Sequence, residues 1–437
     1  MFKTLVDACK MRDVRRKILI TLALLLVYRI GAFVPIPGID PAVFGREIDE
    51  SGAQNFLNLL NSLAGGALAN GAFLALGVGP YITSSIVMQL LTIAIPSLER
   101  LSKQGDEGRR KIAIYTRYVA LFMALAQAIA IVVSFGIANH IQGNLFGDSV
   151  PTFLIGAIVV LALVAGAMFT VWLGDKITEH GIGNGMSMLI FIGIMSSGVL
   201  AFYQSIRSVV GDISEIVTPL VFLGTLILIF FFVVFVDLAE RRIPVSYAKQ
   251  VKGNKMYGGQ NANIPIKINA VGVIPIIFAF SILQFPELIM SMFWNGSPAH
   301  VWYEQWLGLG SWINIVATAL LILGFTFFYA SLSFNPDDVS RQIQQNGGFI
   351  LGFRPGIPTR DYLRRVHNRI TLFGAFFLMI MAVVPALIFR GVFGPGGHPL
   401  TNAFTSIGIL IIVSVALEFD KQLQAQMMIK SYKGFLK

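Results

Sequence analysis

The sequence predicts an all-α polytopic membrane protein, and three observations predict this class. The chain of 437 residues is 55% hydrophobic and only 13% charged, with a mean hydropathy of +0.72, far outside the range of soluble globular proteins. Apolar runs of about 20 residues, the length of a helix that crosses a bilayer, recur along the chain. The 33 Lys and Arg residues lie between these runs in a regular pattern.

Ten apolar runs are long enough to be membrane-spanning helices. An even number of spans places both termini on the same side of the membrane. The predicted spans cover residues 18–35, 72–95, 113–135, 152–173, 185–203, 215–237, 270–294, 312–333, 370–390 and 402–419.

The basic residues predict the orientation of these spans. All but four of the 33 Lys and Arg lie in the two terminal tails, or in and beside the loops that join an even span to the next odd one. The exceptions are Arg46, Arg207 and Arg390 on the other side and Arg29 within the first span. Because cytoplasmic loops carry the excess of Lys and Arg, both termini are predicted to be cytoplasmic. We expect Arg29 to extend outward toward the acidic first outer loop, with a direct functional role as the alternative.

The second span, residues 72–95, contains a break near its start. Gly77, Gly79 and Pro80 free backbone groups that lipid cannot satisfy, so such a break is tolerated only where it faces protein or a water-filled cavity. The span is therefore a candidate pore wall. The preceding residues are moderately apolar and rich in Gly, Ala and Asn. They predict a short helix that folds back between the spans, with an ordinary surface helix as the alternative.

The first long cytoplasmic loop, residues 238–269, is predicted to form a protruding hairpin. Two β-prone runs flank Lys252-Gly253-Asn254, a turn sequence. Lys249, Lys252 and Lys255 then lie near the tip and are candidate docking residues. A solvated charge that only sets topology is the alternative for each of them.

The second long cytoplasmic loop, residues 334–369, is predicted to contain two helices. The first begins at Asn335-Pro336-Asp337-Asp338, which supplies an N-cap, a proline in the first turn and acids at the positive end of the helix dipole. It stops at Gly347-Gly348. After the sequence FRPG, a short basic helix is predicted over 359–369. Arg354 in FRPG is the fourth candidate docking residue.

Motifs of enzymatic chemistry do not occur in this sequence. There is no P-loop, no H-E-x-x-H and no G-x-S-x-G, and the five histidines map to loops or span edges. One cysteine, Cys9, cannot form a disulfide framework or a cysteine metal site. GIGNG, residues 181–185, is predicted to be a tight turn that opens the fifth span. We therefore predict no catalytic residues, no metal and no cofactor.

An ion-coupled secondary transporter is the strongest alternative to a passive channel, since transporters also use broken helices. Coupling to protons or sodium usually needs ionisable groups near the middle of the membrane. Asp237 and Glu418 lie at the cytoplasmic ends of spans, and only Arg29 is deeper. The sequence thus favours the channel over the transporter, and the missing catalytic motifs count against a membrane enzyme.

Long motifs in register along essentially the whole chain resemble the SecY/Sec61-alpha family, whose bacterial members are channel subunits of the protein translocon. The matching stretches are YRIGAFVPIPGID, SGAQNFLNLLNSLAGGAL, ALGVGPYITSSIVMQLL, EGRRKIAIYTRY, WLGDKITEHGIGNGMS, NAVGVIPIIFAFSI, FNPDDVSRQIQQNGGFILGFRPG and VALEFDKQ.

The resemblance implies a clamshell of two inverted pseudo-symmetric halves, residues 1–205 and 206–437, hinged near residues 201–215. It implies a pore-forming subunit that conducts unfolded secretory polypeptides across the cytoplasmic (inner) membrane and releases membrane-protein segments laterally into lipid. Such a channel is not an enzyme, and it takes its driving force from SecA, from translation or from the proton-motive force.

A ring of apolar residues at the narrow waist is implied by the same resemblance. Branched aliphatic side chains dewet a constriction and can seal around any polypeptide. Met186 stands where a branched residue is expected, which predicts a locally looser seal. In the tenth span the motif VALE gives Ile411, whereas Thr405-Ser406 gives Ile409. The matched positions are Val78, Ile82, Met186, Ile190, Ile277 and Ile411.

The plug and the lateral gate are also implied by the resemblance. The plug covers about residues 56–70 and sits under the ring until substrate enters; its named residues are Leu57, Leu60, Leu63, Gly65, Gly66 and Leu68. The gate places residues 82–89 of the second span against 277–285 of the seventh, where polar side chains can pair while it is closed. Its named residues are Thr83, Ser85, Ile86, Gln89, Gln284 and Phe285.

The partners that the resemblance implies are numerous. Subunits similar to SecE and SecG surround the clamshell, and the SecA ATPase or the ribosome docks on Lys249, Lys252, Lys255 and Arg354. Polypeptides that carry signal sequences are the substrates, membrane lipid receives the released segments, and SecDF and YidC associate.

Overall fold

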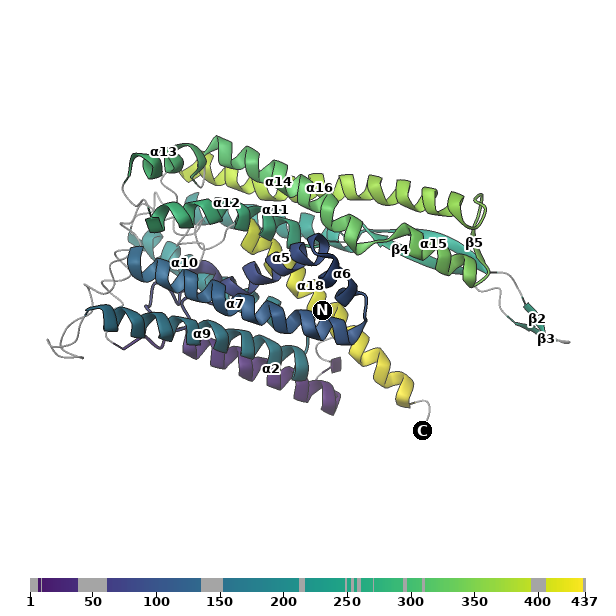
Figure 1. Cartoon of the computed structure of the whole chain (residues 1–437), viewed down its shortest axis with the longest axis horizontal. Helices are drawn as coiled ribbons and strands as arrows, with labels where there is room; N and C mark the ends of the chain where they lie inside the picture. Colours follow the sequence, from purple (N-terminus) through teal and green to yellow (C-terminus); the bar gives the residue numbers. More distant parts are fainter. Residues whose placement is uncertain are drawn as a thin grey trace.

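The computed structural model of this chain is a bundle of long helices with a small β-sheet at one end (Figure 1). It describes residues 7–8, 10–37, 61–134, 152–211, 217–247, 250–252, 255–257, 261–269, 271–293, 297–308, 311–393 and 406–434. The helices are α2 (Arg12–Gly31), α5 (Gly79–Ala94), α6 (Pro96–Ser102), α7 (Asp106–Ser134), α9 (Thr152–His180), α10 (Gly185–Gly211), α11 (Val217–Leu238), α12 (Ile274–Phe293), α13 (Pro298–Leu307), α14 (Trp312–Ser333), α15 (Pro336–Gln345), α16 (Ile357–Phe393) and α18 (Ser406–Gly434).

Each of the ten predicted spans coincides with one of these helices. Six of the described helices are long and apolar enough to cross a membrane, and the bent pair of α5 and α6 adds a seventh. Basic residues at the start of α2 and charged residues in the second half of α18 lower the hydropathy of those two helices. The apolar part of α12 that meets the criterion is only Ile274–Leu283.

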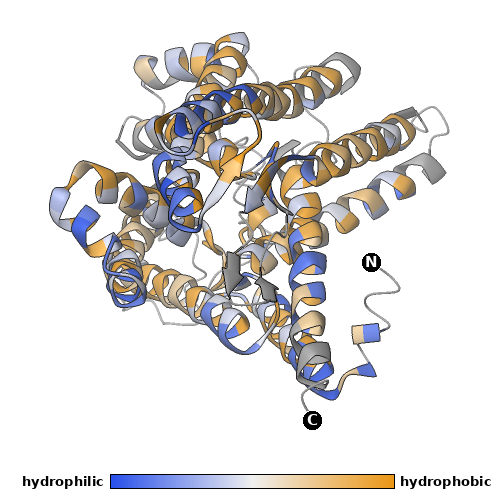
Figure 2. Ribbon diagram, turned by 90° about the vertical axis from the view of Figure 1, so that its right-hand side faces the viewer, coloured by the Kyte–Doolittle hydropathy of each residue, from blue (hydrophilic) through white to orange (hydrophobic). Residues whose placement is uncertain are grey.

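The outer surface of the bundle is apolar, as a multi-pass membrane protein requires. On α11, for example, Leu220, Phe231 and Phe235 are 69%, 73% and 66% exposed. Soluble proteins rarely expose a contiguous surface of such residues, whereas lipid solvates it. Figure 2 shows hydrophobic residues along the bodies of the helices and hydrophilic residues gathered at the sheet end, which faces the viewer.

The second predicted span is broken near its start and ends in a sharp bend. Residues 64–78 form successive turns, and α5 begins only at Gly79. Gly77 has a φ of +51°, which favours glycine, and Pro80 lies in the first turn of α5, where its missing N–H costs no helical hydrogen bond. At Ile95 and Pro96 the chain then bends by 105° into α6. The predicted break is confirmed, but the helix starts later than the hydropathy of residues 72–95 predicts.

The predicted hairpin is confirmed and is part of a larger structure. Strands β2 (Gln250–Lys252) and β3 (Lys255–Tyr257) pair antiparallel and protrude beyond the bundle (Figure 1). Strands β1 (Glu240–Tyr247) and β4 (Asn261–Lys267) pair antiparallel in a second sheet, and β5 (Gly348–Ile350) from the second loop joins the other edge of β1. The two long loops therefore fold as one body, the sheet end of the molecule.

The helix α15 begins and ends where the sequence predicts. The side chain of its N-cap, Asn335, accepts a hydrogen bond from the backbone N–H of Asp337. The prediction of a separate short helix over residues 359–369 is wrong, because α16 runs without interruption from Ile357 to Phe393. No glycine or proline occurs between Pro358 and Gly374, so the backbone has no reason to stop there.

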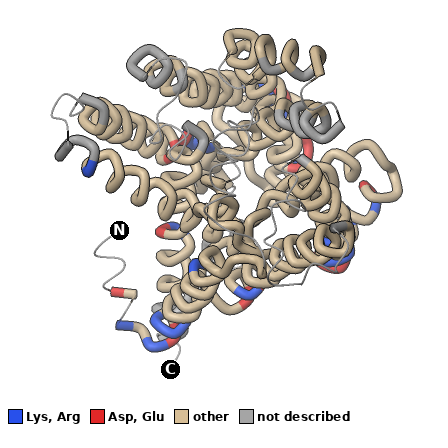
Figure 3. The backbone as a smooth tube through the Cα atoms, turned by 90° about the vertical axis from the view of Figure 1, so that its left-hand side faces the viewer, with Lys and Arg blue, Asp and Glu red and all other residues tan. Residues whose placement is uncertain are grey.

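Charge is distributed unequally between the two ends of the bundle. The sheet end and the start of α16 carry basic residues such as Arg242, Arg354 and Arg365. Figure 3, which views the molecule from the opposite end, shows few charged residues on the described part of that face. The bundle therefore has one strongly basic end.

Candidate functional site

A large apolar cluster lies at the centre of the bundle, and all six predicted ring positions belong to it. Val78, Ile190 and Ile411 are buried in this central cluster, and Ile82, Met186 and Ile277 pack against it while remaining half-buried. Ile409 is buried there too, so the structure leaves the choice between Ile409 and Ile411 open. These residues come from α5 and its N-cap, α10, α12 and α18, and thus from both predicted halves of the chain.

The position of Met186 depends on a glycine in the neighbouring helix. A Cβ on Gly174 of α9 would lie 2.5 Å from the Met186 sulfur, so a larger residue there would displace the end of this side chain. The Met186 backbone N–H donates to Asn184 Oδ1 over 3.1 Å, which caps α10. The sequence GIGNG is thus a turn that caps and opens α10, as predicted. Its Ile182 is buried, with its N–H donated to Thr21 Oγ1 of α2.

Residues 61–78, which we name the seated segment, pack against α2 and against the middle of α9 and α10. Residues 61–63 are helical and the rest form turns. Close backbone contacts hold the segment: a Cβ on Gly193 of α10 would lie 2.4 Å from the Leu63 carbonyl oxygen, and one on Gly166 of α9 would lie 1.7 Å from the Phe73 carbonyl oxygen. Ser197 of α10 donates to the Ser62 carbonyl over 3.2 Å.

Four of the six predicted plug residues lie in the seated segment. Leu68 is buried and Leu63 is half-buried, whereas Gly65 and Gly66 have φ values of +71° and +86°. Both glycines therefore adopt a conformation that L side chains rarely adopt. Leu57 and Leu60 lie outside the described residues.

Arg29 turns toward the seated segment. Its Nη1 donates a hydrogen bond to the Gly65 carbonyl, and its guanidinium carbon lies 4.4 Å from the centre of the Phe33 ring. Most of the acidic loop toward which it was expected to extend, residues 38–60, lies outside the described residues. Sequence analysis missed the Gly65 contact because nothing in the sequence pairs a helix arginine with a carbonyl 36 residues away.

An aromatic seam joins α5, α12 and α14. We use this name for Ile86, Phe278 and Tyr329, which are buried together, and for the side chains packed on them, Ile82, Ile277, Phe325 and Phe328. The Phe278 ring centre lies 4.7 Å from that of Tyr329 and 5.5 Å from that of Phe325. Edge-on and tilted pairs at such distances are favourable aromatic geometries. The predicted contact between the second and seventh spans is therefore present, and α14 shares it.

One hydrogen bond crosses the rim of the aromatic seam. The Tyr329 hydroxyl of α14 donates to Gln89 Oε1 of α5 over 3.1 Å. Gln89 was a predicted gate residue, but Tyr329 was missed, since a tyrosine within an apolar run has no distinctive sequence signal. The Thr83 hydroxyl donates instead to the Gly79 carbonyl of its own helix, so it does not pair across the seam here. Ser85 is half-buried on α5, and Gln284 and Phe285 lie in α12 with side chains outside the described part.

Arg354 is held at an exposed and rigid turn of the sheet end. Phe353 stacks on Tyr362 with 4.2 Å between ring centres, and the Arg354 carbonyl accepts a hydrogen bond from Thr359 Oγ1 over 2.8 Å. The Ser340 hydroxyl of α15 also donates to the Gly356 carbonyl. Lys252 and Lys255 face each other across the β2–β3 ladder by backbone register, and Lys249 lies outside the described residues.

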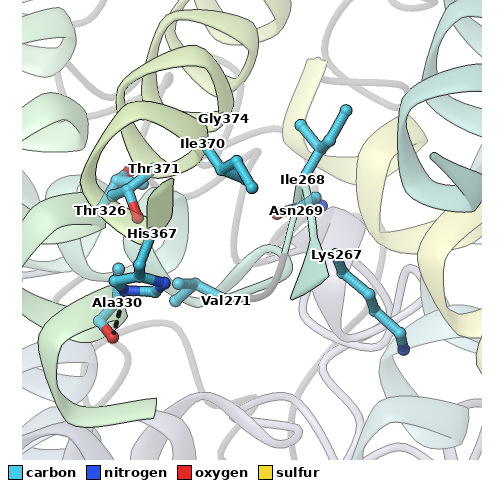
Figure 4. A pocket seen from close by; sticks show the side chains of 10 residues that line it. All are labelled: Lys267, Ile268, Asn269, Val271, Thr326, Ala330, His367, Ile370, Thr371 and Gly374. Carbon is cyan, nitrogen blue, oxygen red and sulfur yellow. Dashed lines mark hydrogen bonds between the residues drawn. The ribbon is translucent and has the colours of Figure 1, made fainter. Parts of the chain in front are cut away.

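A small pocket lies between the sheet end and the helices α14 and α16 (Figure 4). His367 of α16 is buried, and its Nε2 lies 3.1 Å from the Ala330 carbonyl of α14. Asn269, on the far wall, donates to Asp237 Oδ1 of α11, and Asp237 also pairs with Lys421 of α18 over 3.8 Å. These contacts fix the base of the sheet to the bundle. Within the described residues, no three His, Cys, Asp or Glu side chains group in a way that holds a metal ion.

Comparison with known sequences gives one family over most of the chain. The SecY family model matches residues 72–419. The protein translocase subunit SecY of Mycobacterium tuberculosis is 41% identical over 450 residues, and that of Halalkalibacterium halodurans is 38% identical over 443 residues. Each alignment covers 100% of this chain and 100% of the relative.

Comparison with solved structures gives the same fold at much lower identity. A protein-conducting channel aligns with a TM-score of 0.62 and 18% identity, covering 94% of this chain and 92% of the other. Sec61 from a canine ribosome-channel complex of the endoplasmic reticulum aligns with a TM-score of 0.63 and 17% identity, over the same shares of the two chains.

Proposed function

This chain belongs to the SecY family of protein translocase subunits, and we infer that it is the subunit that forms the protein-conducting channel. One observation supports this inference beyond the family match. Apolar residues from both predicted halves, including all six ring positions, meet in the central cluster. We propose that the halves, residues 1–205 and 206–437, separate at this cluster when a polypeptide passes.

The ring of Val78, Ile82, Met186, Ile190, Ile277 and Ile411 is proposed to form the seal of the pore. Apolar side chains cannot hydrogen-bond water in a narrow constriction, so the constriction dewets and blocks ions. The same side chains carry no hydrogen-bonding code, and they can therefore close around any unfolded chain. The unbranched Met186 has more rotational freedom than its neighbours, and it is the ring member that adapts most easily to the passing chain.

We assign the plug to residues 56–70, of which 61–70 belong to the seated segment. Gly65 lets the backbone approach α10 closely, and the small residues at positions 64–67 let the segment fill the space under the ring with little apolar side-chain area. Departure of the segment therefore exposes little apolar surface to water. That property suits a seal that must leave and return with each substrate.

The lateral gate is assigned to the aromatic seam. Opening it separates α5 from α12 and α14 and connects the pore to lipid. A sufficiently apolar segment then partitions into the membrane by its own hydrophobicity. The polar bond between Gln89 and Tyr329 lies at the rim of the seam, where it is broken when the gate opens.

The sheet end is proposed to be the cytoplasmic docking face of a protein of the cytoplasmic membrane, with both termini on that side. The basic excess of this end agrees with the positive-inside rule. We propose that SecA or the ribosome binds the exposed Arg354 turn and the hairpin with Lys249, Lys252 and Lys255. A solved relative of this fold is a canine ribosome-channel complex, and we extend ribosome binding to this chain by that likeness. SecE, SecG, SecDF and YidC are proposed as neighbours on family grounds alone.

We propose that the chain itself catalyses no reaction and that its partners supply the driving force. Depletion of this protein from cells tests the proposed function. We expect precursors that carry signal sequences to accumulate in the cytoplasm as cell growth dilutes the remaining protein. Cytoplasmic enzymes should keep their normal location. Continued export of these precursors after depletion would contradict the function.

Deleting residues 57–69 tests the plug assignment separately. The full chain, purified with the subunits that accompany it, is reconstituted in vesicles of phosphatidylethanolamine and phosphatidylglycerol. The deletion variant should leak chloride faster than the wild type. An unchanged leak would show that these residues do not seal the pore.

A further inference from the structure

We propose that Arg29 is a latch that holds the seated segment against the first helix, so that opening the pore requires breaking the bond between its guanidinium group and the Gly65 carbonyl. This inference rests on the assignment of residues 56–70 to the plug. It gives Arg29 a role in gating, whereas the sequence alone predicts that this side chain extends outward toward the first outer loop.

The position of Arg29 makes its charge costly unless a partner satisfies it. It lies in the last turn of α2, half-buried, one residue after the fully buried Tyr28. A cation at this depth in a membrane protein needs a hydrogen-bond acceptor or an aromatic face. The structure supplies both, since Nη1 donates to the Gly65 carbonyl and the guanidinium carbon lies 4.4 Å from the Phe33 ring centre.

Gly65 is shaped for this contact. With a φ of +71° it turns its carbonyl toward α2, and a Cβ there would lie 3.2 Å from Arg29 Nη1 and 3.1 Å from the Gly193 Cα. Any larger residue therefore pushes the backbone away from both helices. Because position 65 has no side chain, α2 and α10 can both contact the backbone of Gly65.

The other described hydrogen bonds of the segment to its neighbours involve neutral groups. Ser197 Oγ donates to the Ser62 carbonyl over 3.2 Å, and Asn70 Nδ2 donates to the Ala32 carbonyl over 3.4 Å. Hydrogen bonds with a charged donor are roughly twice as strong as neutral ones. The guanidinium group thus makes the strongest single polar contact between the segment and the helices that surround it.

A latch of this kind is released without stranding the charge. When the segment leaves, water that enters the opened pore can solvate the guanidinium group. Phe33, in the turn directly after the C-cap of α2, stays beside the guanidinium and covers one of its faces. The free energy lost with the Gly65 bond is therefore partly recovered. The latch consequently stabilises the closed pore at rest but still allows the pore to open.

The test measures chloride leak through the reconstituted full complex. Arg29→Met keeps the length and apolar stem of the side chain but removes the charge and the donors. We expect the resting leak to rise about tenfold, which corresponds to about 1.4 kcal/mol. Arg29→Lys keeps the charge but lacks the planar group, and it should give an intermediate leak. The control is Arg16→Met, the same change at an exposed position near the other end of α2.

A disulfide separates release of the segment from general damage. The side-chain oxygens of Ser62 and Ser197 lie 3.4 Å apart, so Ser62→Cys with Ser197→Cys, in a Cys9→Ser background, should form a disulfide that locks the segment onto α10. In the Arg29→Met protein, oxidation should return the leak to the wild-type level and reduction should restore it. A leak that oxidation does not repair would overturn the latch.

Different experimental outcomes would contradict the latch and the plug assignment. In the protein that lacks residues 57–69, Arg29→Met should add no further leak. If that deletion leaks but Arg29→Met in the intact chain does not, the latch is wrong and the plug assignment stands. If the deletion itself does not leak, the plug assignment is wrong, and the latch falls with it.

Discussion

The seated segment, our proposed plug, and the aromatic seam, our proposed gate, both pack against the central cluster, but different contacts hold them. The segment is held by backbone groups in close approach, such as the Leu63 carbonyl against Gly193, and by the charge of Arg29. The seam is held by large apolar rings, with Phe278 and Tyr329 at its centre. Adding atoms disturbs the close backbone contacts of the seated segment, whereas removing atoms disturbs the ring packing of the aromatic seam. The two regions can therefore be weakened independently.

The largest effect is expected when atoms are removed from the seam. Phe278 is 1% exposed, and Phe278→Ala leaves a cavity between α12 and α14. We expect the free energy of unfolding to fall by about 3–5 kcal/mol, measured by thermal unfolding in detergent. Phe231→Ala, at a side chain that is 73% exposed on α11, is the matched control and should change it little. Equal losses in the two variants would show that the seam is not a packed core.

A smaller effect is expected when one methyl group is added beneath the seated segment. In Gly193→Ala the new Cβ would lie 2.4 Å from the Leu63 carbonyl oxygen, so the segment must move. We expect a loss of about 1–3 kcal/mol together with a raised chloride leak. Gly224→Ala on α11 meets nothing within 4 Å and should be neutral or slightly stabilising. A Gly193→Ala protein with an unchanged chloride leak would contradict the close packing of this segment on α10.

Removing the hydroxyl of Tyr329 should weaken the rim of the seam but keep its packing. The substitution Tyr329→Phe loses the hydrogen bond to Gln89, worth about 1 kcal/mol, and leaves the ring in place. Export of a precursor with a weakened signal sequence should then rise about fivefold, because the gate opens more easily. Tyr118→Phe, at a ring that is 66% exposed, should not change export. If both variants export alike, the bond does not hold the gate.

The smallest effect is expected at Thr83, since its hydroxyl bonds within its own helix. Thr83→Val should change the unfolding free energy by no more than about 0.5 kcal/mol and leave export unchanged. A strong export phenotype would restore the original expectation that Thr83 pairs across the gate. The assay is the same precursor export that is used for Tyr329→Phe.

The sequence predicts the features of this fold that depend on local chemistry. Gly77 and Pro80 place the break before α5, Asn335 caps α15, and the turn sequence Lys252-Gly253-Asn254 predicts the pairing of β2 with β3. In each case the residue that determines the structure lies within a few positions of it. Ten hydrophobic runs likewise coincide with ten helices, because a backbone surrounded by lipid must satisfy its N–H and C=O groups within its own segment.

The features that the sequence does not predict depend on contacts between distant residues. The bond of Arg29 to Gly65 and that of Tyr329 to Gln89 join positions 36 and 240 residues apart. Strand β5 likewise joins β1 from a distance in sequence, since Val245 pairs with Ile350, 105 residues later. Residue types alone could not select these partners, because many carbonyls and amides were available to each donor.

Joining α5 to α14 tests whether the proposed gate and the proposed plug close independently of each other. The side chains of Gln89 and Tyr329 touch, so Gln89→Cys and Tyr329→Cys in a Cys9→Ser background can be linked by a short bifunctional maleimide. Each single variant treated with the same reagent is the control. We expect that the linked protein neither exports a signal-bearing precursor nor inserts a membrane segment, while its resting chloride leak stays at the wild-type level. Normal export and insertion by the linked protein would contradict this expectation.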